Sequence, residues 1–395
     1  MKYIKLTFSV IFFITFTILL AQNANSWITY SQQYYKIPIT KKGIYKLTYE
    51  NLLKAGVPVT AFDPRSIQIF ANGKEQYIEV IGENDGFFNN GDYIIFYGEG
   101  NNGMYDKNLY PDANNFSNPY KSMFNDTMFY FLTWNSSITN KRIKQINDVN
   151  FSPYTPTNYC LKEIIESYNS YYYYGATDNT GSTDPEYSTA EGWADKYFNI
   201  GEVKTKTIST NNIYYTGPDA YFETVVMGES NYTKLSPDHH LQIRIGSSLY
   251  IDTTYEGYSV NKFKFTISPF NLTKGNTSVN YISINDLGSE VDRNAVSYIR
   301  MVYPATMDVN NECYFDFIMQ NAKDKNKTYV KFQNMGCYTG EIYLYDITNN
   351  YHIQTIKDGS SIHALLPNSA DSLRYYILLS SSNIINIPSS DIIKV

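Results

Sequence analysis

Short segments in which apolar and polar residues alternate recur along most of the chain. A period of two places every second side chain on one face, which is typical of half-buried β-strands. A single short helix is predicted over 50–55, closed by Gly56. Asn72-Gly73 supplies the positive φ angles of a tight turn and is predicted to join two strands as a hairpin. The strands predicted in this first region cover 34–39, 45–49, 67–71, 77–81, 93–97 and 128–134.

Residues 151–190 lack sustained alternation and are rich in Ser, Thr, Tyr, Asn and Gly. This composition predicts a long loop or an insertion between domains. The segment includes a run of four tyrosines, Tyr171 to Tyr174. We expect these rings to pack onto the neighbouring domains, and the alternative is a stacking platform for sugar.

Alternation returns from about residue 191. The predicted strands follow one another at intervals of 15 to 20 residues, which is typical of a jelly-roll sandwich. A last group of strands follows closer to the C-terminus. The two groups cover 221–227, 241–245, 262–267, 279–284 and 296–302, then 313–318, 328–332, 342–345 and 375–379.

These patterns predict an all-β protein, because heptads, parallel βαβ units and tandem repeats are missing from the sequence. We expect an N-terminal β domain over 22–150 and the loop or linker over 151–190. A jelly-roll-like β-sandwich over 191–308 and a further β-rich segment over 309–395 follow.

The N-terminus has the pattern of a signal peptide. Lys2 and Lys5 flank the start of an apolar stretch of 16 residues from Leu6 to Ala21, whereas a membrane-spanning helix needs about 20. We predict a signal peptide over 1–21; the alternative is an uncleaved anchor. No second apolar run is long enough to span a membrane, so no transmembrane span is expected after cleavage. The chain is therefore predicted to be exported to the periplasm, the outer-membrane surface or the extracellular space.

Composition excludes several classes of protein. With 43% hydrophobic and 16% aromatic residues the chain is not disordered, and a net charge of −6 argues against nucleic-acid binding. The 40 Tyr and 41 Asn suit half-buried strands and the turns between them. They are weak evidence for a ligand.

The residues that could carry chemistry are few. The three cysteines are Cys160, Cys313 and Cys337; a bridge between the last two is possible, but small buried hydrophobes are the favoured interpretation. His239 and His240 are adjacent, so on a strand at most one serves a given site. His352 and His363 lie in turn-like segments, and the charged run 323–327 is predicted to be a solvated hairpin tip. No catalytic residue is predicted.

Oxygen-bearing side chains crowd the segment 83–92. Asp85, Asn89, Asn90 and Asp92 could hold Ca²⁺, although their spacing does not match an EF-hand loop. The favoured alternative is a pair of turns in which Asp and Asn bind their own backbone. Asp85, Asn89 and Asp92 are the weak calcium candidate, and no other cofactor is expected.

A series of short motifs runs in order through most of residues 27–395. Each is weak alone, and their order makes the set more specific. They are Trp27, Tyr34-Tyr35-Lys36-Ile37, Gly43-Ile44-Tyr45-Lys46-Leu47, Asp63-Pro64-Arg65-Ser66-Ile67, Asn72-Gly73-Lys74-Glu75, residues 91–98, Asn125-Asp126-Thr127 before residues 130–134, Glu191-Gly192-Trp193 and Tyr345-Asp346-Ile347-Thr348.

In this order the motifs resemble the N-terminal region of gingipain-family cysteine peptidases, most of all the PorU-type sortases of the type IX secretion system. The resemblance implies an exported protein of the Bacteroidota, from a family that removes the C-terminal sorting domain of secreted cargo and joins the cargo to a surface glycolipid. The implied partners are type IX secretion components, cargo or glycolipid.

The resemblance places the family's catalytic Cys and His in a caspase-like domain that follows this region. This chain reaches Val395 before any such pattern, so its cysteines should not inherit those roles. The leading hypothesis is a non-catalytic region that positions a peptidase domain or binds cargo or glycolipid. The alternatives are a stand-alone carbohydrate- or surface-binding β-sandwich and an active peptidase.

Overall fold

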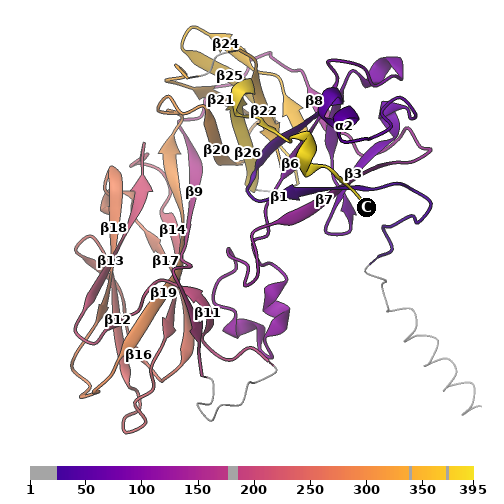
Figure 1. Ribbon diagram of the computed structural model, residues 1–395. Coiled ribbons are helices and arrows are strands. Elements are labelled where there is room, and N and C mark those ends of the chain that lie inside the picture. Colours follow the sequence, from indigo (N-terminus) through magenta and orange to yellow (C-terminus); the bar gives the residue numbers. More distant parts are fainter. Residues whose placement is uncertain (1–24, 177–185, 338–339, 371–372) are drawn as a thin grey trace, which may run out of the picture.

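The computed structural model describes residues 25–176, 186–337, 340–370 and 373–395. Strands dominate, and they are arranged as facing sheets in three units, which we call the N-terminal unit, the middle sandwich and the C-terminal unit (Figure 1). The predicted all-β class is confirmed. The predicted signal peptide, 1–21, lies outside the described residues.

The N-terminal unit packs a five-stranded sheet, of order β28-β1-β7-β3-β4, against a four-stranded sheet, of order β27-β2-β6-β5. Alternating apolar side chains of both sheets fill the space between them, among them Ile37, Ile69 and Phe96. The strands are β1 (Tyr35–Ile39), β2 (Gly43–Thr48), β3 (Ile67–Ala71), β4 (Lys74–Glu75), β5 (Ile78–Ile81), β6 (Tyr93–Gly98), β7 (Met128–Trp134), β27 (Ile385–Asn386) and β28 (Ile393–Lys394).

Local signals in this unit behave as expected, with one exception. Helix α2 (Tyr49–Lys54) is capped by Thr48 and ends before Gly56, whose φ is +79°. Asn72 and Gly73 do form a turn with positive φ, at 49° and 72°. However, the turn joins β3 to β4, and β5 pairs with β6 in the other sheet. The predicted hairpin between 67–71 and 77–81 is wrong, because alternation does not specify which sheet a strand enters.

An excursion from the N-terminal unit, residues 99–127, lies against the middle sandwich beside β11 (Glu191–Ala194) (Figure 1). Tyr110 donates to the Glu191 carbonyl at 2.8 Å, and Asn118 Nδ2 donates to the Ser297 carbonyl at 3.2 Å. The 3-10 helices of the N-terminal unit and this excursion are η1 (Pro64–Ser66), η2 (Glu83–Asp85), η3 (Asp106–Leu109) and η4 (Ala113–Asn115).

The middle sandwich faces the four-stranded sheet β13-β18-β15-β16 with the β17-β14-β19-β9 part of a ten-stranded sheet. Side chains such as Phe222, Ile243 and Ile299 fill its core. Its elements are β9 (Tyr159–Ser167), β12 (Phe198–Asn199), β13 (Val203–Thr210), β14 (Ala220–Gly228), β15 (His239–Ile245), β16 (Ser248–Tyr255), β17 (Ser259–Ile267), η5 (Pro269–Asn271), β18 (Gly275–Ser283) and β19 (Arg293–Thr306).

The prediction of a loop over 151–190 is wrong for its described central part. Strand β9 runs through this segment and pairs with β19 along its whole length, and β10 (Tyr171–Tyr174) pairs with β11. Side chains on both faces of β9 are mostly half-buried, so neither face is clearly the buried one. A strand in that setting has no clear alternation to detect.

The C-terminal unit pairs β20-β26-β22-β23-β8 with a three-stranded sheet, β21-β25-β24. Strand β9 meets β20 at Leu161 and Ile318, so one sheet continues from the middle sandwich into this unit. The elements are β8 (Lys144–Ile146), β20 (Tyr314–Gln320), β21 (Lys327–Phe332), β22 (Ile342–Asp346), β23 (Tyr351–Ile353), β24 (Ile356–Asp358), β25 (Ser361–Pro367), β26 (Leu373–Ser380), η6 (Ser381–Asn383) and η7 (Ser389–Asp391).

The end of the chain returns to its beginning. Strand β28 pairs with β1, and β27 runs parallel to β2, so residues 309–395 do not form a separate unit in space. Beneath this crossing, Ile44 and Ile95 of the N-terminal unit pack with Tyr343, Tyr345 and Ile377 of the C-terminal unit. Among the described residues no helix is long and apolar enough to cross a membrane.

Candidate functional site

A buried polar cluster surrounds His239 at the start of β15. Its Nδ1 lies 2.5 Å from Asp292 Oδ1, and its Nε2 lies 3.0 Å from the Ser230 carbonyl. Burial alone would lower the pKa of His239, but the hydrogen bond and the charge of Asp292 outweigh it and raise that pKa. Both ring nitrogens of His239 thus have a hydrogen-bonding partner within the protein.

This cluster does not have the order of a catalytic triad. Ser283 Oγ donates to Asp292 Oδ2 at 2.7 Å, whereas in a triad the His stands between the Ser and the acid. The side chains of His239, Asp292 and Ser283 are at most 1% exposed. Because no substrate can reach them, the cluster serves as a structural network.

The other histidines are also engaged by neighbours. His240 points away from His239 toward Asp286 and Asp252, at 2.8 Å and 2.7 Å, as expected for adjacent strand residues. His352 and His363 lie in β23 and β25, so the expectation that they occupy turns is wrong. Within the described residues no hydrogen bond joins a His ring to a thiol or a serine hydroxyl.

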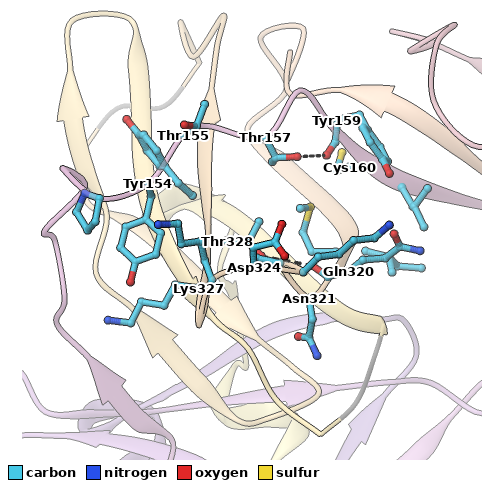
Figure 2. A pocket seen from close by; sticks show the side chains of 18 residues that line it. Tyr154, Thr155, Thr157, Tyr159, Cys160, Gln320, Asn321, Asp324, Lys327 and Thr328 are labelled. Carbon is cyan, nitrogen blue, oxygen red and sulfur yellow. Dashed lines mark hydrogen bonds between the residues drawn. The ribbon is translucent and has the colours of Figure 1, made fainter.

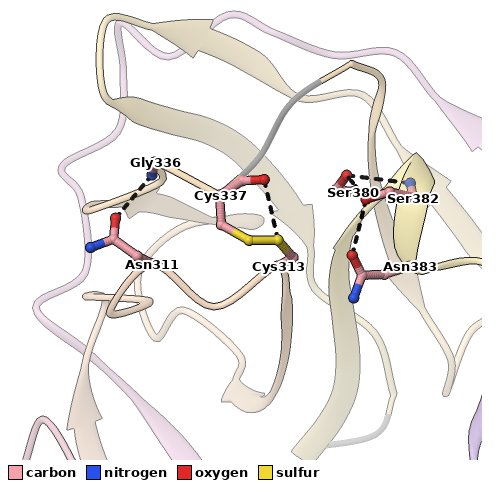
Figure 3. Close-up of a disulfide and its surroundings, with 7 residues drawn as sticks. All are labelled: Asn311, Cys313, Gly336, Cys337, Ser380, Ser382 and Asn383. Carbon is pink, nitrogen blue, oxygen red and sulfur yellow. Dashed lines mark hydrogen bonds between the residues drawn. A yellow bond between two sulfur atoms is a disulfide. The ribbon is translucent and has the colours of Figure 1, made fainter.

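The cysteines divide into a pair and a single buried thiol. Cys313 and Cys337 form a disulfide with a Cα–Cα distance of 5.2 Å (Figure 3). The favoured interpretation of these two as buried hydrophobes is therefore wrong. It holds for Cys160, which is 1% exposed. Burial raises the pKa of the Cys160 thiol to about 12, which disfavours the thiolate that a nucleophile requires.

The segment predicted as a calcium candidate is a set of turns in which the side chains bind nearby groups. Asp85 Oδ1 accepts from the Phe87 amide at 2.9 Å, and Asp92 Oδ2 accepts from the Asn89 amide at 2.6 Å. Asn89 Nδ2 also reaches Asp85 Oδ2 at 3.4 Å. In the described part of the chain, no group of three His, Cys, Asp or Glu side chains is placed to hold a metal.

The tyrosine run forms one strand of the two-stranded ribbon β10-β11. Tyr172 donates to Glu191 at 2.7 Å, and Tyr173 donates to the Asp195 carbonyl at 2.9 Å. Tyr174 is the most exposed of the four, at 71%. The two central tyrosines are thus fixed to the middle sandwich, as the packing interpretation predicts.

A cleft of about 520 Å³ lies where the middle sandwich meets the C-terminal unit (Figure 2). Its floor is formed by the start of β9 and the end of β20. Its rim is the connection between β20 and β21, residues 321–326. Tyr154 and Tyr159 lie toward two ends of the cleft, with Thr328, Asp324 and Gln320 between them (Figure 2). We call this the junction cleft.

Sequence reasoning missed this cleft, and one prediction about it is wrong. The charged run 323–327 is not the tip of a hairpin, because β20 pairs with β26 and β21 pairs with β25 in another sheet. The run crosses between the sheets and forms the rim. Tyr154 and Tyr159 fall in the segment predicted as a loop. Because β9, which begins at Tyr159, is not predicted, the two tyrosines could not be placed at the start of a strand.

Comparisons with known proteins support the fold. No protein-family model and no curated protein matches the chain. The crystal structure of dimeric latent PorU from Porphyromonas gingivalis aligns with a TM-score of 0.58 and 11% identity, over 92% of this chain and 33% of that one. The chain therefore spans about a third of that protein's length. At this identity the similarity shows a shared, PorU-like fold and nothing finer.

A carbohydrate-binding domain is also similar, at a much lower level. The CBM36-1 domain of a multidomain xylanase from the hindgut metagenome of Trinervitermes trinervoides aligns with a TM-score of 0.21 and 14% identity, over 35% of this chain and 96% of that one. A TM-score this low carries no argument about the fold or the function of this chain.

Proposed function

We propose that this chain is the non-catalytic, β-rich part of a type IX secretion sortase-like protein of the gingipain family, and that it positions a peptidase domain. The fold shared with PorU over 92% of the chain is the observation that carries the proposal. Export to the periplasm, the outer-membrane surface or the extracellular space is part of the same proposal. Secreted cargo, a surface glycolipid and other type IX components are the partners proposed.

The way the units are joined supports a positioning role. Ile95 and Ile377 are fully buried where the N-terminal and C-terminal units meet, and after β26 the chain returns to the N-terminal unit as β27 and β28. A domain is held in place only when the parts of its support do not move relative to one another. An apolar junction that the chain crosses twice, between β7 and β8 and between β26 and β27, meets that requirement.

Deletion of the gene in its own bacterium tests the proposal. We expect secreted cargo to keep its C-terminal sorting domain, seen as a larger product on immunoblots, and to be lost from the surface. The wild-type gene should restore processing, whereas Ile95→Asp, which places a charge in the apolar junction, should not. The exposed Ile165→Thr is the matched control and should restore it. Normal cargo processing in the deletion strain would overturn the proposal.

A stand-alone carbohydrate-binding protein is the second candidate, favoured by the tyrosines of the junction cleft. Glycan binding by the purified chain, combined with normal sorting in the deletion strain, would favour it. An active peptidase is disfavoured by the disulfide and by the buried Cys160 thiol. Cargo cleavage by the purified chain that is lost in a Cys160→Ser variant would establish it.

A further inference from the structure

We propose that the junction cleft binds an oligosaccharide. The proposal rests on the cleft itself and not on the sortase-like role. Binding is measured with the purified chain and sorting is measured in cells, so either proposal can fail without the other.

The size and the walls of the cleft suit a chain of sugar rings. Its volume of about 520 Å³ lies within the range of about 300–1,000 Å³ of small-molecule sites. Tyr159 is half-buried, and its ring stacks on Tyr214 at 5.3 Å with an interplanar angle of 11°. This contact fixes the orientation of the Tyr159 ring. Tyrosine offers an apolar face to the C–H side of a sugar and a hydroxyl to its edge.

The cleft also presents exposed polar groups that no protein group engages. The side chains of Thr155, Gln320 and Asp324 line it, and they make no hydrogen bond or ion pair within the described residues. Hydroxyl, amide and carboxylate groups can exchange hydrogen bonds with the hydroxyls of a sugar. A wholly apolar ligand would instead leave them unpaired and desolvated, which is unfavourable.

The rim is held in place before any ligand arrives. Asn368 Nδ2 donates to the carbonyls of Ala322 and Lys325 at 2.9 Å and 2.8 Å, and its Oδ1 accepts from the Ala322 amide at 3.1 Å. On the opposite side Tyr154 donates to Asn326 Oδ1 at 2.7 Å. A site ordered in advance loses less conformational entropy when it binds. The rim of the cleft is therefore ordered before a ligand binds.

Charges on the rim bear on which sugars bind best. Lys327 is paired with Asp148, whereas Lys323, Asp324 and Lys325 have no ion pair in the described part of the chain. The unpaired charges sum to +1, on a chain whose net charge is −6. Glycans with carboxylates should therefore bind somewhat more tightly than neutral ones, and salt should reduce that advantage.

Isothermal titration of the full-length chain with cellohexaose, chitohexaose and hexagalacturonate tests the proposal. We expect at least one to bind with a Kd of about 1 mM or tighter. Tyr159→Ala should weaken binding about tenfold. Tyr159→Phe, which keeps the ring, should retain most of it. The exposed Tyr105→Ala, outside the cleft, is the matched control and should bind as the wild type does.

Two outcomes would overturn the proposal. The first is that none of the three sugars binds. The second is that Tyr159→Ala and Gln320→Ala, both folded by circular dichroism, bind as tightly as the wild type. If only hexagalacturonate binds, and 0.5 M NaCl weakens it while Tyr159→Ala also weakens it, the ligand is an acidic glycan. If the neutral sugars bind equally well, ring stacking dominates.

Discussion

The junction between the N-terminal and C-terminal units has a buried apolar centre beside one cavity of about 250 Å³, which Ile44 and Tyr345 help to line, whereas the junction between the C-terminal unit and the middle sandwich contains two cavities. In the first, Ile44, Ile95 and Ile377 pack with at most 1% exposure. In the second, β9 pairs with β20 only at Leu161 and Ile318. The junction cleft and a second cavity of about 240 Å³ lie around that pair.

The difference shows how one chain can combine rigidity with an accessible site. Buried apolar side chains fix two units against each other. Strands that pair briefly and then diverge keep two units in register and leave space beside them. Asp316 on β20 belongs to both junctions, because Lys42 of the N-terminal unit and Lys162 of β9 both reach its carboxylate.

Truncating a side chain in the apolar junction between the N-terminal and C-terminal units should lower stability more than truncating an exposed side chain. Ile95→Ala removes a side chain with no exposure and should lower the free energy of unfolding by about 2–5 kcal/mol. Ile165 of β9 is 38% exposed, and Ile165→Ala should cost well under about 1 kcal/mol. Urea titration followed by circular dichroism measures both. Ile165 lies outside both junctions, so equal losses in the two variants would mean that burial of Ile95 at the apolar junction adds no stability.

Removing the disulfide should lower stability without changing the affinity of the junction cleft for sugars. It joins Cys313 before β20 to Cys337 after β21, at the ends of these strands opposite the cleft rim. For a loop of this length, replacing both cysteines by Ser should cost about 2–4 kcal/mol. Urea titration measures this loss, and titration with the sugars should give unchanged affinity. A loss of affinity in the folded variant would show that the whole unit, and not its rim, shapes the cleft.

Asp316 should matter for stability in a pH-dependent way. Burial alone would raise the pKa of Asp316, but the charges of Lys162 and Lys42, with hydrogen bonds from Lys162 and Tyr375, outweigh it and lower that pKa. An acid with a lowered folded-state pKa stabilises the fold above its ordinary value of 3.8 and loses this effect as the pH falls through the folded value.

Asp316→Asn should therefore cost about 1–3 kcal/mol at pH 7, because it leaves the half-buried Lys162 without a counter-charge. The difference from the wild type should shrink as the pH falls below 3.8. Urea titrations at pH 7 and at pH values below 3.8 measure it. The exposed Asp324, which forms no ion pair in the described part of the chain, supplies the control Asp324→Asn. A pH-independent loss in Asp316→Asn would contradict this account.

The apolar junction and the junction cleft also differ in how much of each the sequence predicts. The predicted bounds of β3 and β7 match the structure to the residue, and β7 is predicted from its apolar and aromatic run and not from alternation. Alternation missed β13 and β9 for different reasons. In β13 only Ile208 is a buried apolar residue, whereas β9 is half-buried on both faces. Period-two patterns are read from alternating apolar and polar residues. The faces of β13 alternate in burial, but its inner face carries Lys204, Lys206 and Thr210 beside Ile208, and β9 has no clearly buried face.

The cleft depends on pairings that local patterns do not contain. Whether residues 323–327 form a hairpin tip or a crossing between sheets is decided by β26 and β25, about 40 or more residues later in the chain. The disulfide depends on the same pairings, because they bring Cys313 and Cys337 together. Spacing allowed the bridge without requiring it.

Asn368, which hydrogen-bonds to the rim of the junction cleft, should contribute little to stability and much to binding. Asn368→Ala removes three hydrogen bonds from the rim of the cleft and should cost only about 1 kcal/mol, since the residue is half-buried. The affinity for the sugars should nevertheless fall about tenfold, because the rim must then be ordered when the ligand binds. Asn383→Ala, at an exposed asparagine in η6, should change neither quantity. If Asn368→Ala lowers stability by as much as Ile95→Ala, the rim is part of the folded core. Unchanged affinity would instead show that the order of the rim is not what makes the cleft a site.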